Sequence, residues 1–158
     1  MFGLWRAHRA RRAAKSAILP LVERTRSRCG AIPEVAWLDA YIMGFLATLI
    51  TLFGTQKSGP LHADALAALQ SGAWADITNM PGDLAGEQIC YLSVAKDATF
   101  LQGCRNAEIF FQSFFSAQAD LAPREVQNES PDEAVASRDE LALWTHYFES
   151  HLAAETHG

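Results

Sequence analysis

One segment constrains the fold of this 158-residue chain more than any other, because residues 35–53 carry a single charged side chain, Asp39. A helix that is apolar almost all round is stable only when it is buried on every side. Pro33 precedes the segment in a position that favours a first helical turn, and Gly54 follows it as a helix terminator. The pattern therefore predicts that residues 34–53 form the most buried helix of the fold.

The two sides of this expected helix differ in the size of their side chains. One side is broad and bulky, and the other is narrow and built from small residues, so another helix can approach it closely. The bulky side comprises Leu38, Tyr41, Ile42, Phe45, Leu46, Leu49, Leu52 and Phe53, and the small side comprises Ala36, Ala40, Gly44, Ala47, Thr48 and Thr51.

The same segment has the length of a membrane span and follows a basic N-terminus, as the positive-inside rule prefers. Its apolar residues contribute roughly −4 to −5 kcal/mol to insertion, and Asp39 with the polar residues returns about 3 to 4 kcal/mol, so insertion is close to break-even. The amphipathic helices expected elsewhere need an apolar element to pack on. We therefore favour a buried central helix and keep a single span at residues 35–53 as the alternative.

The rest of the chain also has helical patterns. Hydrophobic residues make up 49% of the chain, and alanine, leucine and other good helix formers dominate its composition. The alternation of apolar and polar residues that is typical of strands is missing. We expect an all-α fold, a small helical bundle of about five to six helices with a basic N-terminal helical arm. Gly72 is expected to end a short helix, and a turn is expected at residues 79–83. We also expect a mobile acidic loop near residues 119–130. The expected helical ranges are 3–19, a short one to about residue 28, 34–53, 61–70, 84–95, 97–118 and 131–154.

Charge divides the chain into two regions. Residues 1–30 hold eight of the 13 basic side chains and one of the 18 acidic ones, a formal charge of +7, which leaves −12 for residues 31–158. We therefore expect residues 1–30 to form a basic helical arm kinked at Pro20, and residues 31–158 to form an acidic α-helical domain. On this hypothesis, removal of residues 1–29 leaves the domain from Ile32 onward folded.

No motif in the chain indicates catalysis, a cofactor or a metal. The phosphate-binding, hydrolase and zinc-protease signatures are missing. A metal site needs three or four converging ligands, so His146, Glu149 and His151 are expected on a solvated face opposite Trp144 and Phe148. We expect a non-enzymatic protein without cofactor or metal.

Two further features have a structural and a functional interpretation. Asp39 is expected near a helix N-terminus, where the helix dipole or an arginine stabilises a carboxylate, and a general-base role would need a partner that the sequence does not identify. Aromatic residues at helical spacing usually form core rather than a ligand pocket. The cluster in question comprises Phe110, Phe111, Phe114 and Phe115.

The basic arm is the strongest indication of function. Its arginines could contact an acidic protein surface, anionic lipid headgroups or nucleic-acid phosphates, or remain a solvated helix without a partner. The acidic body disfavours nucleic acid. We favour protein binding, with peripheral membrane association as the alternative and homo-oligomerisation left open. The candidate partner-binding residues are Trp5, Arg6, Arg9, Arg11, Arg12 and Lys15.

Localisation follows from the same N-terminal region and from the cysteines. The apolar stretch at residues 17–22 is too short for a signal peptide and contains Pro20. Cys29, Cys90 and Cys104 form an odd set without a CxxC pair, which argues against a disulfide framework. We expect a cytoplasmic protein, with inner-membrane association as the alternative.

Overall fold

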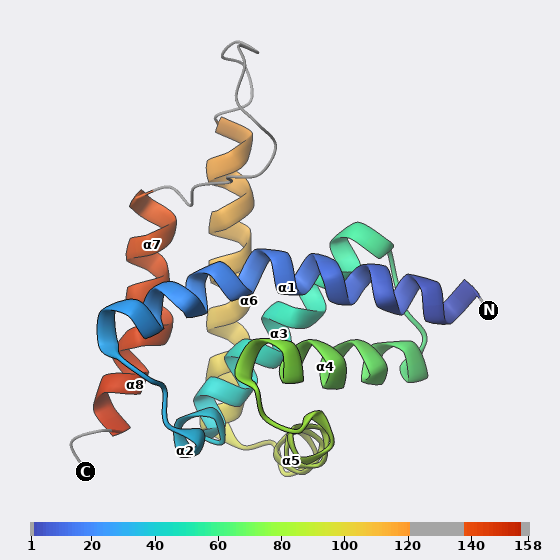
Figure 1. Ribbon diagram of the computed structural model, residues 1–158, viewed down its shortest axis with the longest axis horizontal. Helices are drawn as coiled ribbons and strands as arrows, with labels where there is room; N and C mark the ends of the chain where they lie inside the picture. Colours follow the sequence, from blue (N-terminus) through green and yellow to red (C-terminus); the bar gives the residue numbers. More distant parts are fainter. Residues whose placement is uncertain (1, 121–137, 156–158) are drawn as a thin grey trace.

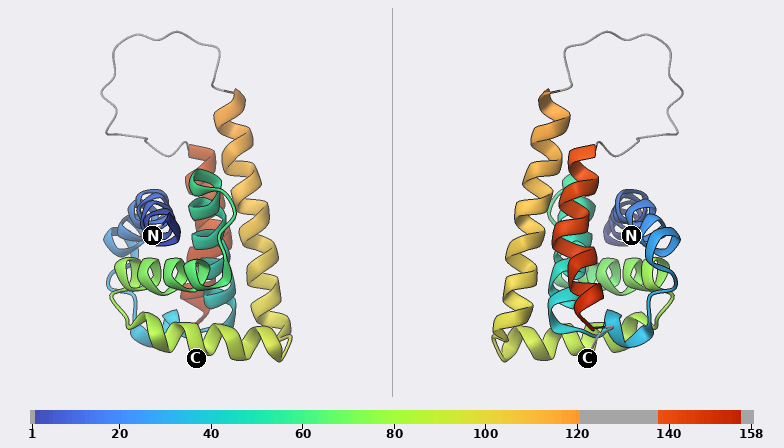
Figure 2. Two further views of the ribbon diagram at one scale, coloured as in Figure 1. Left: turned by 90° about the vertical axis from the view of Figure 1, so that its right-hand side faces the viewer. Right: turned by 90° about the vertical axis from the view of Figure 1, so that its left-hand side faces the viewer.

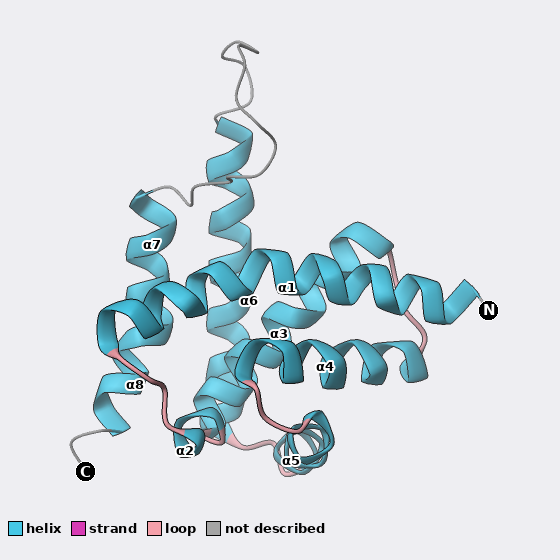
Figure 3. Ribbon diagram, viewed as in Figure 1, coloured by secondary structure: helices cyan, strands magenta, loops and turns pink. Residues whose placement is uncertain are grey.

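The computed structural model describes residues 2–120 and 138–155, and these residues form helices without a strand (Figures 1 and 3). The expected all-α helical bundle is confirmed. The described ranges contain seven continuous helices, the last of which includes one π-helical turn. The elements are α1 (Phe2–Cys29), α2 (Glu34–Trp37), α3 (Ala40–Ser58), α4 (Ala63–Thr78), α5 (Gly82–Val94), α6 (Ala98–Asp120), α7 (Arg138–Trp144), the π-turn η1 (Thr145–Glu149) and α8 (Ser150–Glu155).

Helix α3 lies at the centre of the bundle. It packs against α6 on one side and against α1 and α4 on another (Figure 2). Eleven of its 19 residues are buried, including Phe45, Leu46 and Leu49. This confirms that the apolar segment supplies the most buried helix. None of the helices in the described ranges has the length and apolar character that crossing a membrane requires.

Asp39 divides the segment that was expected to be one helix. Its backbone is extended, and its Oδ1 accepts a hydrogen bond of 3.1 Å from the Ile42 amide, so Asp39 is the N-cap of α3. The short helix α2 precedes it, so the expected helix at residues 34–53 is observed as two helices. The structural interpretation of Asp39 is confirmed, because the carboxylate satisfies a free amide at a helix N-terminus.

The small side of α3 receives α6 at close range. A Cβ atom on Gly44 would overlap the carbonyl oxygen of Phe100 and lie 3.3 Å from the backbone nitrogen of Cys104. A Cβ on Gly103 of α6 would overlap the carbonyl oxygen of Tyr41. The expectation of a close helix approach is confirmed, and it depends on a glycine from each helix.

The N-terminal helix is not separate from the body. Helix α1 packs along α3 and α4 (Figure 1), and its inward residues Ala10, Ala14, Ile18 and Val22 are fully buried. A distinct basic arm is therefore not seen.

The expected interruption at Pro20 is wrong, since α1 runs through this proline. Pro20 is exposed, and the backbone hydrogen bond that it removes would join the carbonyl of Ser16, which is also exposed. Water can satisfy that carbonyl. Burial of Ile18, Leu21 and Val22 on the opposite side offsets the loss of one hydrogen bond.

Helix α4 is longer than expected, because Gly72 does not end it. A Cβ on Gly72 would lie 2.9 Å from the Cδ of Arg11, so the glycine makes room for the Arg11 side chain to cross α4. The expected turn after α4 is confirmed, with Asn79 in the left-handed conformation at a φ of 60°.

Some expectations fall outside the described residues. Helix α6 continues to Asp120, so residues 119 and 120 are helical and not part of the expected loop at residues 119–130. The rest of that expected loop lies outside the described residues. The expected start of the last helix near residue 131 also lies outside the described ranges, which resume at Arg138.

Candidate binding face on the N-terminal helix

Helix α1 has one face in the core and one face in solvent. Helical spacing places Trp5, Arg9, Arg12 and Ser16 on the side opposite the buried alanines, with His8 and Lys15 beside them. All six are exposed. We call this set the basic face, and it contains four of the six residues proposed from sequence to bind a partner, namely Trp5, Arg9, Arg12 and Lys15.

Arg6, by contrast, is engaged within the protein. Its Nε and Nη2 donate hydrogen bonds of 3.2 and 2.8 Å to the Ser58 carbonyl oxygen at the C-terminal end of α3. A helix leaves its last carbonyls without backbone partners, and a cation is favourable there. Arg6 therefore caps α3 rather than facing a partner.

Arg11 is also committed to the fold. Its Nε and Nη2 donate to the two carboxylate oxygens of Asp76 on α4, both at 2.7 Å. The hydrogen bond from Arg11 lowers the pKa of Asp76, and the same pairing raises the pKa of Arg11. The interaction ties α1 to α4, so Arg11 is removed from the set of available partner-binding residues.

Two of the three basic residues in the second half of α1 follow the same pattern. Arg26 donates to Glu23 and to the Ile77 carbonyl at 2.9 Å, and Arg28 pairs with Glu149 at 3.1 Å. The positive charge that remains exposed and uncommitted is thus concentrated in the first half of the helix. Sequence composition alone could not separate the two groups, because Ile77 and Glu149 lie more than 50 residues away from the arginines that they bind.

The geometry of the basic face suits an anionic partner with some apolar surface. The Trp5 side chain is 63% exposed, and the Arg9 guanidinium lies 5.8 Å from the centre of its ring, close enough for a cation–π contact. A shallow hollow of about 400 Å³ runs along the face between Trp5, Arg9 and Arg12. Guanidinium groups bind carboxylates and phosphates in a bidentate manner, and tryptophan supplies a large flat contact.

The expected solvated face near the C-terminus is wrong for Glu149, which is only 6% exposed. The π-turn η1 widens the helical turn, so that Glu149 follows Phe148 toward α1. Glu149 accepts a hydrogen bond of 2.9 Å from the Thr25 hydroxyl, and the Trp144 indole donates to the same Thr25 oxygen at 2.9 Å. This buried network anchors the C-terminal helix to α1.

His151 has a structural environment of its own. Its ring stacks on Tyr41 with a centroid distance of 3.6 Å, and burial lowers the pKa of His151 against the opposing effect of Asp39. The Tyr41 hydroxyl donates to the Tyr147 carbonyl and accepts from Asn106. Among the described residues, no group of three His, Cys, Asp or Glu side chains has a geometry that could hold a metal ion.

The phenylalanine cluster packs on α3. Phe110 is fully buried, and the Phe53 ring lies 5.1 Å from Phe111 and 5.3 Å from Phe114 in edge-to-face geometry. Such pairs stabilise a core. The structure thus places Phe111 and Phe114 around Phe53, whereas Asp39 caps α3 near the other end of that helix.

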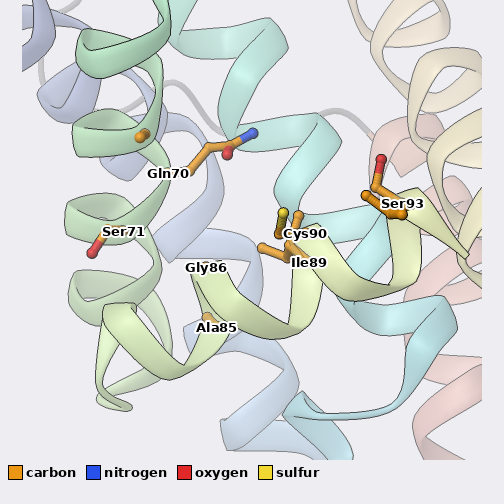
Figure 4. Close-up of a pocket in the computed structure, with 9 residues that line it drawn as sticks. Gln70, Ser71, Ala85, Gly86, Ile89, Cys90 and Ser93 are labelled. Carbon is orange, nitrogen blue, oxygen red and sulfur yellow. The ribbon is translucent and has the colours of Figure 1, made fainter.

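A hollow of about 480 Å³ lies between α4 and α5 (Figure 4). Gln70 and Ser71 line it from α4, and Ala85, Ile89 and Cys90 line it from α5. The residues that line it include no acidic, basic or histidine side chain. Cys90 therefore has no general base in this hollow that could activate its thiol.

The fold and the faces described above define the class of this protein as an all-α helical bundle. No protein-family model, curated protein or solved structure matches the chain. Its function is therefore inferred from the geometry of its surfaces.

Proposed function

We propose that this helical bundle is a non-enzymatic protein that binds an acidic protein surface through the basic face of α1. One observation supports this most strongly: Arg6 and Arg11 are used within the fold, whereas Arg9, Arg12 and Lys15 remain exposed beside an exposed Trp5. Exposed tryptophan and arginine are the residues most enriched at the energetic centres of protein interfaces.

The membrane alternative is less well supported by the geometry. A helix that lies in a membrane interface buries its own apolar face among the lipids. The apolar face of α1, with Ala14, Ile18 and Val22, is already buried against the bundle. Among the residues of α1 whose burial the structure describes, the exposed large apolar side chains are Leu4 and Trp5 near the N-terminal end.

Iodide quenching of tryptophan fluorescence tests the proposal. Trp37, Trp74 and Trp144 are at most 2% exposed, so the fluorescence that iodide quenches comes from Trp5. Synthetic deca-glutamate, used as a probe of acidic protein surface at low salt, should protect Trp5 from iodide. The variant R9E/R12E should lose that protection.

A charge-matched control separates this face from net charge. The double variant K57E/R105E changes two exposed basic residues on other helices and should keep the protection of Trp5. Equal protection in R9E/R12E, or none in the unmodified protein, would contradict the proposal. Protection by phosphatidylserine vesicles but not by deca-glutamate would favour the membrane alternative instead.

A further inference from the structure

Helix α5 carries three large apolar side chains that are exposed to solvent. Leu84, Tyr91 and Val94 are 47, 67 and 79% exposed, and helical spacing places them on one side with Asp83 and Glu87. We call these five residues the acidic face. Helix α5 contains no lysine or arginine, so this face combines negative charge with aromatic and aliphatic surface.

The acidic face of α5 and the basic face of α1 are complementary in charge. The basic face contains no acidic residue, and the acidic face contains no basic one. Within residues 2–120 and 138–155, Arg12, Asp83 and Glu87 form no ion pair. Charge complementarity of this kind raises association rates and determines which surfaces meet.

We propose that the basic face of one copy docks on the acidic face of α5 in a second copy, with the two helices antiparallel. The proposal rests on the proposed function and names the acidic surface. With a rise of about 1.5 Å per residue, Trp5 to Arg12 and Tyr91 to Asp83 span similar lengths of roughly 10 to 12 Å. An antiparallel register therefore places Trp5 against Tyr91, Arg9 against Glu87, and Arg12 against Asp83.

The contact is heterologous, since the two faces belong to different surfaces of one molecule. Helix α4 lies between α1 and α5 in each copy (Figure 2). A contact that joins two different surfaces leaves one free face at each end of a dimer, so it continues into a chain or closes into a ring. A single pair of helices buries little area, and screening by salt acts on every charge pair in it. The association is therefore weak and sensitive to salt.

Sedimentation velocity of the full chain tests this arrangement. The unmodified protein should associate in about 20 mM salt and dissociate in about 0.5 M salt. The variants R9E/R12E and D83R/E87R should each weaken self-association by at least about tenfold, because each removes one of the two faces. Their equimolar mixture should associate again, because R9E/R12E keeps the acidic face and D83R/E87R keeps the basic face. A misfolded variant could not restore association in this way.

Charge-matched controls change exposed residues elsewhere. The variants K57E/R105E and E34R/E108R should associate like the unmodified protein. A protein that stays monomeric at every salt concentration, yet shows protection of Trp5 by deca-glutamate, would overturn this inference and leave the proposed function standing. Loss of association in R9E/R12E but not in D83R/E87R would also overturn it. Loss of both association and peptide protection would overturn both proposals.

Discussion

Replacement of Gly103 by alanine tests the close packing of α3 and α6 at its tightest point. The new Cβ would overlap the Tyr41 carbonyl oxygen and lie 2.8 Å from the Phe45 backbone nitrogen. Ordinary van der Waals contacts lie near 3.5 Å, so α6 must move outward by about 1 Å or slightly more. Because this shift weakens packing along both helices, we expect a loss of about 1 to 3 kcal/mol in the free energy of unfolding.

Gly86→Ala is the matched control. Gly86 lies within α5, and nothing stands within 4 Å of a Cβ placed there. Alanine in a helix interior is favoured over glycine by roughly 0.5 to 1 kcal/mol, so this variant should be more stable by about that amount. Urea unfolding followed by far-UV circular dichroism measures both variants. A Gly103→Ala protein as stable as Gly86→Ala would refute the proposed close approach.

Three further variants probe other parts of the account. Ile18→Ala should lower the free energy of unfolding in urea by about 2 to 5 kcal/mol, because Ile18 is fully buried in the core; a loss below about 1 kcal/mol would show that α1 is peripheral. Glu149→Ala should cost about 1 to 3 kcal/mol in the same assay, because it removes the buried carboxylate that accepts from the Thr25 hydroxyl and pairs with Arg28. Exposed Glu108→Ala should be close to neutral. Burial lowers the pKa of His151, so the unfolded chain binds a proton there more readily than the folded protein does. The free energy of unfolding should therefore fall as the pH drops below about 6.5. His151→Gln should flatten that decline in melts taken across about pH 5 to 8.

The elements that could be predicted from sequence are those with a local cause. The apolar run of α3, its glycine on the small side and the turn at Asn79 each follow from residues adjacent in the chain. The division at Asp39 was not predicted, because the length of the apolar run favoured one continuous helix over residues 34–53. Helix type was therefore predictable, and some boundaries were not.

The position of α1 could not be read from composition. Its arginines suggested a free arm, yet two of those nearest the N-terminus meet Ser58 and Asp76, which lie far along the chain. Gly72 misled for a similar reason, since its role is to admit Arg11. Glu149 was misplaced because a π-turn shifts the helical register, and no sequence pattern indicates that turn. For α1 and Gly72 a long-range contact determined the outcome, and for Glu149 the change in helical register did.

The central claim is that one face of α1 is an integral part of the core while the other is free to bind. Native-state hydrogen exchange measures the first half of this claim at individual amides. The amides of Ala14, Ile18 and Val22 should exchange only through global unfolding, with the same free energy as those of Leu46 and Leu49 in α3. Exchange of the α1 amides through a separate opening of much lower free energy, while α3 remains protected, would contradict the account.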